Sequence, residues 1–327
     1  MATDCRTTLS RRSFLAAAGT LSAAAWLAPS TLLAGERRRR PFMPLVEGPV
    51  QAIRRAAAAD PVDIRALRGG LSVLAGSGGN VAAHVGPDGV LLIDSGIVGA
   101  KVAAAVASLT RAPIRHVVNT HWHFDHTDAN AWLHARGASI LAHENTRRHL
   151  SADTRVEDWD FTFPRSPAGA LPTTLLTGDR TLRLDGAAVA IRRHAPAHTD
   201  SDLSVHFVDA DVLHVGDTWW NGLFPFIDYS TGGSIDGTIR ATDDHLARTS
   251  AGTIIVPGHG PVGGRAELLR YRDMLLAVRD RVAALKARGH SMAEAVAARP
   301  TAAFDARWTG AGPIGPDFFT RLVYKGV

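Results

Sequence analysis

The chain contains one cysteine, Cys5, close to its N-terminus. The sequence after it can therefore form no disulfide bond and offers no thiolate as a metal ligand or nucleophile. Any metal centre must be built from nitrogen and oxygen ligands, and covalent cross-links contribute nothing to the stability of the fold.

The body of the chain also lacks net charge. The formal net charge is +5, but residues 1–40 carry seven arginines against two acidic residues and account for all of it. A neutral body creates no overall field that would attract a phosphate backbone, so we expect no nucleic-acid partner. The length of 327 residues, 46% of them hydrophobic, suits one large or two small globular domains.

No apolar run is strong enough to predict a transmembrane helix with assurance. Residues 15–33 are rich in alanine, glycine, serine and threonine and include Pro29. They follow the pair Arg11-Arg12, a pattern typical of a Tat-type signal peptide over residues 1–34. We therefore expect the Tat export machinery as a partner and a periplasmic location. Secretion, or membrane anchoring by an uncleaved signal, is the alternative.

The rest of the sequence predicts an N-terminal arm followed by one domain. Residues 35–65 contain four consecutive arginines, the prolines Pro41, Pro44 and Pro49, and a short helix-like stretch, which indicate a linker or N-terminal arm. Residues 66–327 alternate strand and helix patterns in two similar halves. Strands are expected at 71–74, 81–85, 90–94, 114–119, 139–142, 181–184, 187–191, 203–208, 212–215 and 253–256, and helices at 101–109, 129–135, 235–247 and 265–288. This order favours an α/β (α+β) fold, a four-layer αββα sandwich of two mixed β-sheets flanked by helices.

The strongest chemical signal is the hexapeptide HWHFDH at residues 121–126. Three imidazoles and a carboxylate are ligands that zinc, iron and manganese accept. The hexapeptide follows the expected strand 114–119, and Thr127 or Asp128 is expected to cap the helix that comes next. The ligands would then lie at the carboxyl end of a strand, where open α/β folds bind their ligands.

Ligand-type residues also follow three other expected strands. His194 and His198 come after the strand 187–191, Asp217 comes after 212–215, and His259 comes after 253–256. Glycines and prolines around them favour tight turns. All four stretches can therefore meet at one edge of the sandwich.

Together these motifs resemble the metallo-β-lactamase superfamily of hydrolases over about residues 70–262: HxHxDH at 121–126, His198-Thr199, Gly216-Asp217 and Gly258-His259-Gly260. The resemblance implies a centre of two Zn²⁺ ions, with iron or manganese as alternatives. It implies His121, His123 and His198 on the first metal, Asp125, His126 and His259 on the second, and Asp217 as the bridge. His198 is preferred to His194 because family members place threonine directly after this ligand. Asp94 is expected to hydrogen-bond a metal-binding histidine, and His143 is the next candidate for such a role.

Two metals that share a water lower its pKa and supply hydroxide at neutral pH, and Asp125 would be catalytic by orienting it and handling its proton. Some β-lactamases of the superfamily use cysteine where this chain has Asp217, which thioesterase, lactonase and phosphodiesterase branches show. The sequence thus predicts a periplasmic dinuclear zinc hydrolase acting on an ester, lactone, thioester or β-lactam carbonyl. The alternative is an iron-dependent enzyme resembling the sulfur dioxygenases of the same fold.

Aromatic residues supply a prediction about the small-molecule substrate. Five lie between residues 218 and 229, and others lie in the excursion 151–178, which is expected to be irregular. Beside a metal centre they would form a pocket for an apolar or aromatic substrate. The alternative is that they pack in the core.

Overall fold

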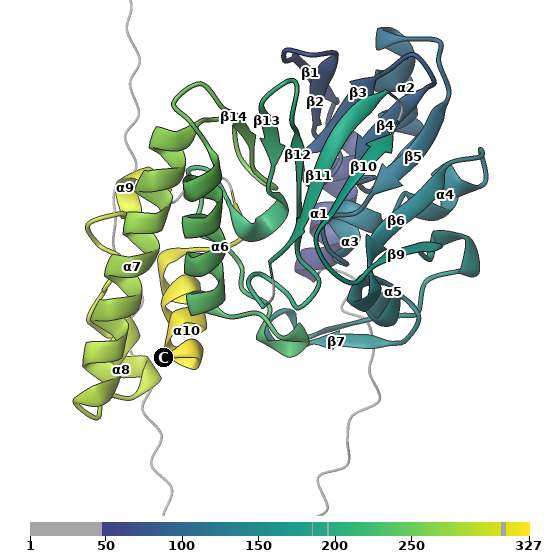
Figure 1. The fold of residues 1–327 in the computed structure, drawn as a ribbon. Coiled ribbons are helices and arrows are strands. Elements are labelled where there is room, and N and C mark those ends of the chain that lie inside the picture. Colours follow the sequence, from purple (N-terminus) through teal and green to yellow (C-terminus); the bar gives the residue numbers. More distant parts are fainter. Residues whose placement is uncertain (1–47, 185, 195, 309–311) are drawn as a thin grey trace, which may run out of the picture. The chain divides into compact units, whose positions relative to one another are not determined.

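A computed structural model describes residues 48–184, 186–194, 196–308 and 312–327, all within the unit Pro44–Val327 (Figure 1). The expected signal peptide and the first part of the expected arm lie outside the described residues. Among the described residues, no helix combines the length and the apolar character that crossing a membrane requires.

The first sheet has seven strands, and its central strands are buried on both faces. Its order is β1 (Asp63–Ala66), β2 (Leu71–Ala75), β3 (Val81–Val85), β4 (Val90–Ile93), β5 (Ile114–Val118), β6 (Ser139–His143) and β9 (Thr174–Leu176). The strands β1 to β4 form an antiparallel meander, and β5, β6 and β9 then add in parallel. The sequence Val-Leu-Leu-Ile of β4 is buried at every position, as a strand covered on both faces requires.

The second sheet has five strands and packs face to face on the first. Its order is β10 (Arg180–Leu184), β11 (Ala187–Arg193), β12 (Leu203–Phe207), β13 (Val212–His214) and β14 (Ile254–Val256), with only β13 and β14 parallel. One apolar cluster joins the two inner faces, for example Leu91 and Val118 with Val205 and Val256. Burying this shared surface holds the two sheets together.

Helices cover the two outer faces (Figure 1). On the first sheet, Val102 and Val106 of α2 (Gly99–Leu109) and Leu133 of α4 (Asn130–His134) pack on strand residues such as Leu92. On the second sheet, α6 (Ile235–Arg248) and α7 (Arg265–Ala287) pack on Leu213 and its neighbours. The C-terminal helices α8 (Met292–Ala297), α9 (Asp305–Trp308) and α10 (Pro316–Gly326) continue this layer. The predicted αββα sandwich is confirmed.

Several short helices and strands in the structure were not predicted from the sequence. The excursion 151–178 contains β7 (Thr154–Val156) paired with β8 (Phe161–Phe163), the 3₁₀ turns η1 (Glu157–Trp159) and η2 (Ala168–Ala170), and β9 in the main sheet. The helix α5 (Glu144–Leu150) precedes it. Strands of three residues are too short to display an alternating pattern, so the expectation of an irregular segment was wrong here.

The N-terminal arm also contributes ordered elements. The helix α1 (Pro49–Ala59) and most of β1 fall within the expected arm 35–65. The side chain of Val50 is fully buried, and β1 pairs with β2 along four residues. The second half of this arm is therefore integrated into the folded unit.

The expected helix cap after the hexapeptide was wrong. The chain forms the short helix α3 (Phe124–Thr127) inside the hexapeptide, before α4 begins. The Thr127 hydroxyl lies within α3 and donates to the carbonyl oxygens of Trp122 and His123, while Asp128 forms an ion pair with Arg54. The N-cap residue of α4 is Ala129, which makes no capping hydrogen bond through its side chain.

The start of α6 packs unusually closely on the loop that precedes His198. The Ser234 hydroxyl accepts a hydrogen bond from the Gly237 amide, and the Ser234 amide donates to the Ala197 carbonyl at 2.7 Å. A Cβ atom at Gly237 would collide with the Pro196 carbonyl oxygen. The glycine therefore sets the position of α6 against this loop.

This contact predicts whether alanine at position 237 stabilises or destabilises the protein. Glycine to alanine inside a helix usually stabilises a protein, but Gly237→Ala should lower the free energy of unfolding by about 2 kcal/mol because of the clash. Urea unfolding measures the effect. Gly178→Ala is the matched control, because nothing lies within 4 Å of its added Cβ. Equal unfolding midpoints for Gly237→Ala and the wild type would contradict this packing.

Candidate metal centre

The four sequence stretches meet at one edge of the sandwich, as predicted. The hexapeptide follows β5, His198 follows β11, Asp217 lies in the 3₁₀ turn η3 (Gly216–Thr218) after β13, and His259 follows β14. Backbone hydrogen bonds fasten these loops together, including Leu203 N to Thr120 O at 2.7 Å and Gly258 N to Gly216 O at 2.7 Å. A Cβ atom at Gly258 would collide with the Asp217 carboxylate, so this position needs glycine.

The first cluster contains His121, His123, His198 and Asp217, all buried. Its candidate ligand atoms all lie within 4.8 Å of one another. The Nε2 atom of His198 is 2.8 Å from His123 Nδ1 and 3.4 Å from Asp217 Oδ2. The Nε2 atom of His121 lies 3.9 Å from the same Asp217 oxygen. Three imidazole nitrogens and one carboxylate oxygen thus face a common point.

The second cluster contains Asp125, His126 and His259. The Oδ2 atom of Asp125 is 3.5 Å from His126 Nε2 and 3.2 Å from His259 Nε2. Asp217 reaches this cluster too, because its Oδ1 lies 3.1 Å from His126 Nε2 and its Oδ2 lies 3.3 Å from His259 Nε2. Its carboxylate therefore stands between the two clusters, as a bridging ligand would.

Hydrogen bonds behind the clusters fix which ring nitrogen faces inward. Asp94 Oδ2 lies 2.8 Å from His126 Nδ1, and Asp94 Oδ1 accepts from the Thr120 amide. The Phe226 carbonyl lies 2.8 Å from His198 Nδ1. The outward nitrogen of each ring is thereby engaged and its Nε2 left free to bind a metal. Asp94 has the position that the sequence analysis expected, and its backbone adopts φ of 65°, a conformation that non-glycine residues rarely adopt.

Asp228 plays a similar part that the sequence analysis missed. Its Oδ2 lies 3.0 Å from His123 Nε2, which leaves Nδ1 of that histidine facing the first cluster. Asp228 also caps the 3₁₀ turn η4 (Tyr229–Thr231), and its side chain is fully buried. No motif spacing connects residues 123 and 228, so only the folded chain reveals the pair.

Unpartnered polar atoms test whether these residues fit metal ions. Within the described part of the chain, His121 Nε2, His126 Nε2 and Asp217 Oδ1 are buried and have no hydrogen-bond partner. Buried polar atoms without partners are costly, and a divalent ion in each cluster would satisfy them. The donor set of five imidazoles and two carboxylates suits zinc, iron or manganese. The residues therefore fit a two-metal centre, although they do not select one metal.

Comparison with known proteins agrees with this geometry. The family model described as the metallo-beta-lactamase superfamily matches residues 75–259. The chain belongs to this superfamily. Membership supports the predicted class of metal-dependent hydrolase.

One protein sequence and two solved structures are similar to parts of this chain. The alpha subunit of 2,4-dinitroanisole O-demethylase from Nocardioides sp. is 29% identical over 114 residues, which are 34% of this chain and 31% of that protein. A double mutant of the sec-alkyl sulfatase PisA1 superposes with a TM-score of 0.62 at 16% identity, over 84% of this chain and 54% of that one. The DIM-1 metallo-beta-lactamase superposes with a TM-score of 0.55 at 19% identity, over 66% of this chain and 97% of that one. These structural matches show a common fold.

In the metal-free site, protonated histidines supply the positive charge that bound metal ions would otherwise supply. Burial opposes charge on both His126 and His259, but Asp217 and Asp125 outweigh it. They raise the pKa of His126 well above its usual value and the pKa of His259 to about 9. Burial lowers the pKa of His198 to about 4, so this ring is neutral.

The two carboxylates remain charged despite their burial. Burial alone would raise the pKa of Asp125, but His126 and His259 lower it to about 2. His259 and His126 likewise lower the pKa of Asp217 well below its usual value, against the effect of burial. In the metal-free protein the two carboxylates are balanced by the two protonated histidines, whose protons would be exchanged for metal.

A pocket of about 280 Å³ opens above the two clusters. The aromatic residues divide between the two predicted roles: Trp220, Phe226 and Trp159 line this pocket, while Trp219 and Phe224 are buried in the core. Some of these aromatic residues therefore line a pocket and others pack in the core, while an apolar or aromatic substrate stays a prediction.

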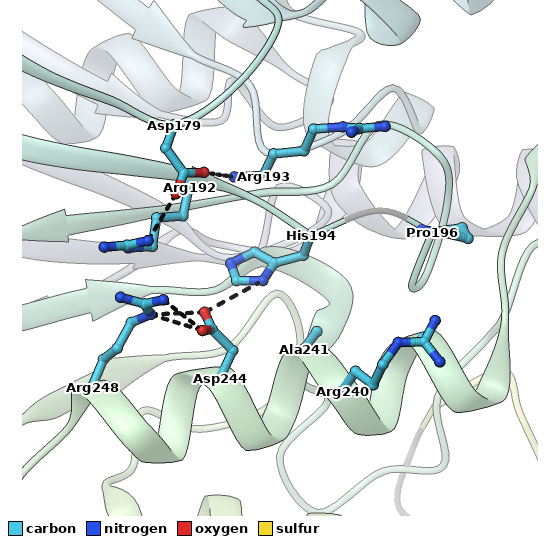
Figure 2. A pocket seen from close by; sticks show the side chains of 10 residues that line it. Asp179, Arg192, Arg193, His194, Pro196, Arg240, Ala241, Asp244 and Arg248 are labelled. Carbon is cyan, nitrogen blue, oxygen red and sulfur yellow. Dashed lines mark hydrogen bonds and ion pairs between the residues drawn. The ribbon is translucent and has the colours of Figure 1, made fainter.

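His194 and His143 lie away from the two clusters. His194 lines a different pocket beside Asp244, with its Nδ1 3.8 Å from Asp244 Oδ2 (Figure 2). Arg248 holds the same carboxylate at 2.7 Å. His143 caps α5, where its Nδ1 accepts from the Asn145 amide. The geometry thus favours His198 over His194 as the ligand.

The raised histidine pKa values predict proton release when metal binds. Titration of metal-free protein with zinc at pH 7 should release at least two protons per chain, one each from His126 and His259, and a further one where the metal-bound water becomes hydroxide. Isothermal titration calorimetry in buffers of different ionisation enthalpy measures this number. It should fall as the pH rises through about 9, where His259 loses its proton before zinc binds.

The raised pKa of His259 also makes the stability of the metal-free protein depend on pH. The folded-state pKa of His259 is raised, so its protonation stabilises the metal-free protein below about pH 6.5. That contribution is lost as pH rises through about 9. Zinc binding without proton release at pH 7 would contradict the electrostatic description of the site.

Proposed function

We propose that the protein is an exported dinuclear zinc hydrolase whose substrate carries an ester, lactone, thioester or β-lactam carbonyl. The observation that carries this proposal is the position of Asp217 between two complete clusters of ligands. The pocket above the clusters supplies space for a small molecule.

The chain's own residues supply the arrangement that such a reaction needs. The two bound ions would lower the pKa of a water molecule and polarise the carbonyl. Asp125 lines the pocket, and its contacts with His126 and His259 both use Oδ2. Its Oδ1 is then available to orient the attacking water and to accept its proton. Asp94 and Asp228 hold the histidines in position from behind.

The second cluster also weighs against the iron-dependent dioxygenase. A mononuclear iron in the first cluster would leave Asp125, His126 and His259 without a role. A hydrolase with two metals uses both clusters.

Turnover of a substrate panel tests this function. Protein containing two zinc ions per chain should hydrolyse at least one ester, lactone, thioester or β-lactam. A sulfate ester and an aryl methyl ether belong in the panel because of the relatives' names. Asp125→Asn should lower kcat by about 10²-fold or more. Asp88→Asn, at an exposed turn, is the matched control. No hydrolysis of any member by the fully loaded protein would refute the proposal.

The exported location rests on the twin-arginine pair and needs a separate test. Replacement of both Arg11 and Arg12 by lysine should retain the protein in the cytoplasm, because the Tat machinery reads this pair. Cell fractionation and immunoblotting measure the distribution. A double substitution by lysine at two other arginines, Arg37 and Arg38, is the control and should leave the wild-type distribution unchanged. Equal distribution of the Arg11/Arg12 variant and the wild type would contradict export by this route.

A further inference from the structure

The pocket above the metal centre has apolar walls, and in the part of the chain that the structure describes no lysine or arginine lines it. The wall residues are Ile53, Trp159, Trp220, Leu223, Phe226 and Pro313. Among the described residues, the remaining lining consists of glycines and of residues from the two metal-binding clusters. The walls therefore offer no side chain that could neutralise a negative group on a substrate.

One wall comes from a segment that precedes the family domain. Ile53 belongs to α1, whereas the superfamily match begins at residue 75. Arg54 fixes this helix through two hydrogen bonds to Asp128, at 2.8 and 3.1 Å, and its guanidinium lies over the Phe124 ring. Lys101 donates to the Ala57 carbonyl at 2.7 Å. The wall is thereby anchored to the same short helix that carries Asp125 and His126.

A second wall is fastened by the C-terminal helix. Trp159 stands in η1, and its neighbour Asp158 forms an ion pair with Lys325 of α10. The Glu157 amide donates to the Ser230 hydroxyl at 2.9 Å. Pro313 also lines the pocket and lies beyond residue 259, where the superfamily match ends. Packed and hydrogen-bonded segments hold the walls in place, so they cannot easily move aside for a poorly fitting group.

A charged group against these walls would be unfavourable. Taking a carboxylate out of water costs free energy unless a cation or hydrogen-bond donors replace the water. The metal ions attract anions only at the floor of the pocket, where the reacting bond must lie. An apolar group on the walls gains free energy from its burial instead.

We propose that these walls select substrates whose acyl group is apolar and uncharged, so that the enzyme favours neutral esters, lactones or thioesters over substrates with a second, anionic group. This inference rests on the proposed hydrolase function and narrows its substrate class. β-Lactams that carry a carboxylate beside the ring fall in the disfavoured class. The volume of about 280 Å³ lies just below the range typical of ligand pockets, which favours a short chain or a single ring.

A matched pair of esters tests the selection. The 4-nitrophenyl ester of hexanoic acid and the 4-nitrophenyl monoester of hexanedioic acid have chains of equal length, and the second ends in a carboxylate. The zinc-loaded enzyme should show a kcat/KM about 100-fold lower for the charged ester, because its terminal carboxylate is buried without a partner. Equal kcat/KM values would overturn the inference.

A cation placed in the wall should reverse the preference. Leu223 is half-buried, lines the pocket and belongs to neither cluster, so Leu223→Lys should improve kcat/KM for the charged ester relative to the neutral one by about tenfold or more. Leu269→Lys adds the same charge on exposed α7 and should leave the ratio unchanged. Ile53→Lys provides a second position on a different wall. An unchanged ratio in both wall variants would overturn the inference.

A binding measurement separates this inference from the hydrolase proposal. Quenching of tryptophan fluorescence in the zinc-loaded protein reports binding of 2-octanone and of 7-oxooctanoate, neither of which can be hydrolysed. Leu223→Lys should strengthen binding of the keto acid relative to the ketone by about tenfold. If no member of the substrate panel is cleaved, the hydrolase proposal fails and this titration alone decides the inference. An equal effect of the variant on both ligands would then refute it.

Discussion

The whole arrangement depends on one buried carboxylate, that of Asp217. Its oxygens contact both clusters: Oδ1 lies 3.1 Å from His126 Nε2, and Oδ2 lies 3.4 Å from His198 Nε2 and 3.3 Å from His259 Nε2. A charge in such a position is tolerable only when cations surround it, and here protonated His126 and His259 or two metal ions can supply them. The close approach of Gly258 then becomes a requirement, because any larger residue would displace the carboxylate.

The sandwich serves this constraint by bringing four strand ends to one edge. The two sheets share an apolar core, and the loops beyond it carry the ligands. Most of the apolar wall residues lie within the superfamily match, and Ile53 and Pro313 add to them from segments outside it. The centre fits the general chemistry of the superfamily, while the walls carry the substrate preference that we propose.

The sequence predicted which ligand-type residues meet at one edge of the sandwich, because the signals for them are local. Three histidines and an aspartate within six residues announce a metal site, and regular strand and helix patterns of adequate length place it at a sheet edge. Asp228 escaped notice because it meets His123 only through the fold, 105 residues away. Similarly, β7 and β8 are too short for a pattern. The expected cap after the hexapeptide was wrong because the separate short helix α3 forms within the hexapeptide. The Thr127 hydroxyl therefore donates to the His123 carbonyl, and Asp128 pairs with Arg54.

The most direct test of the central claim is an anomalous-diffraction map of zinc-loaded crystals. The account predicts two peaks about 3.5–4 Å apart, one on each side of the Asp217 carboxylate. His121, His123 and His198 should surround one peak, and Asp125, His126 and His259 the other. A single peak in the first cluster, with Asp217 bound through one oxygen and the second cluster empty, would contradict it.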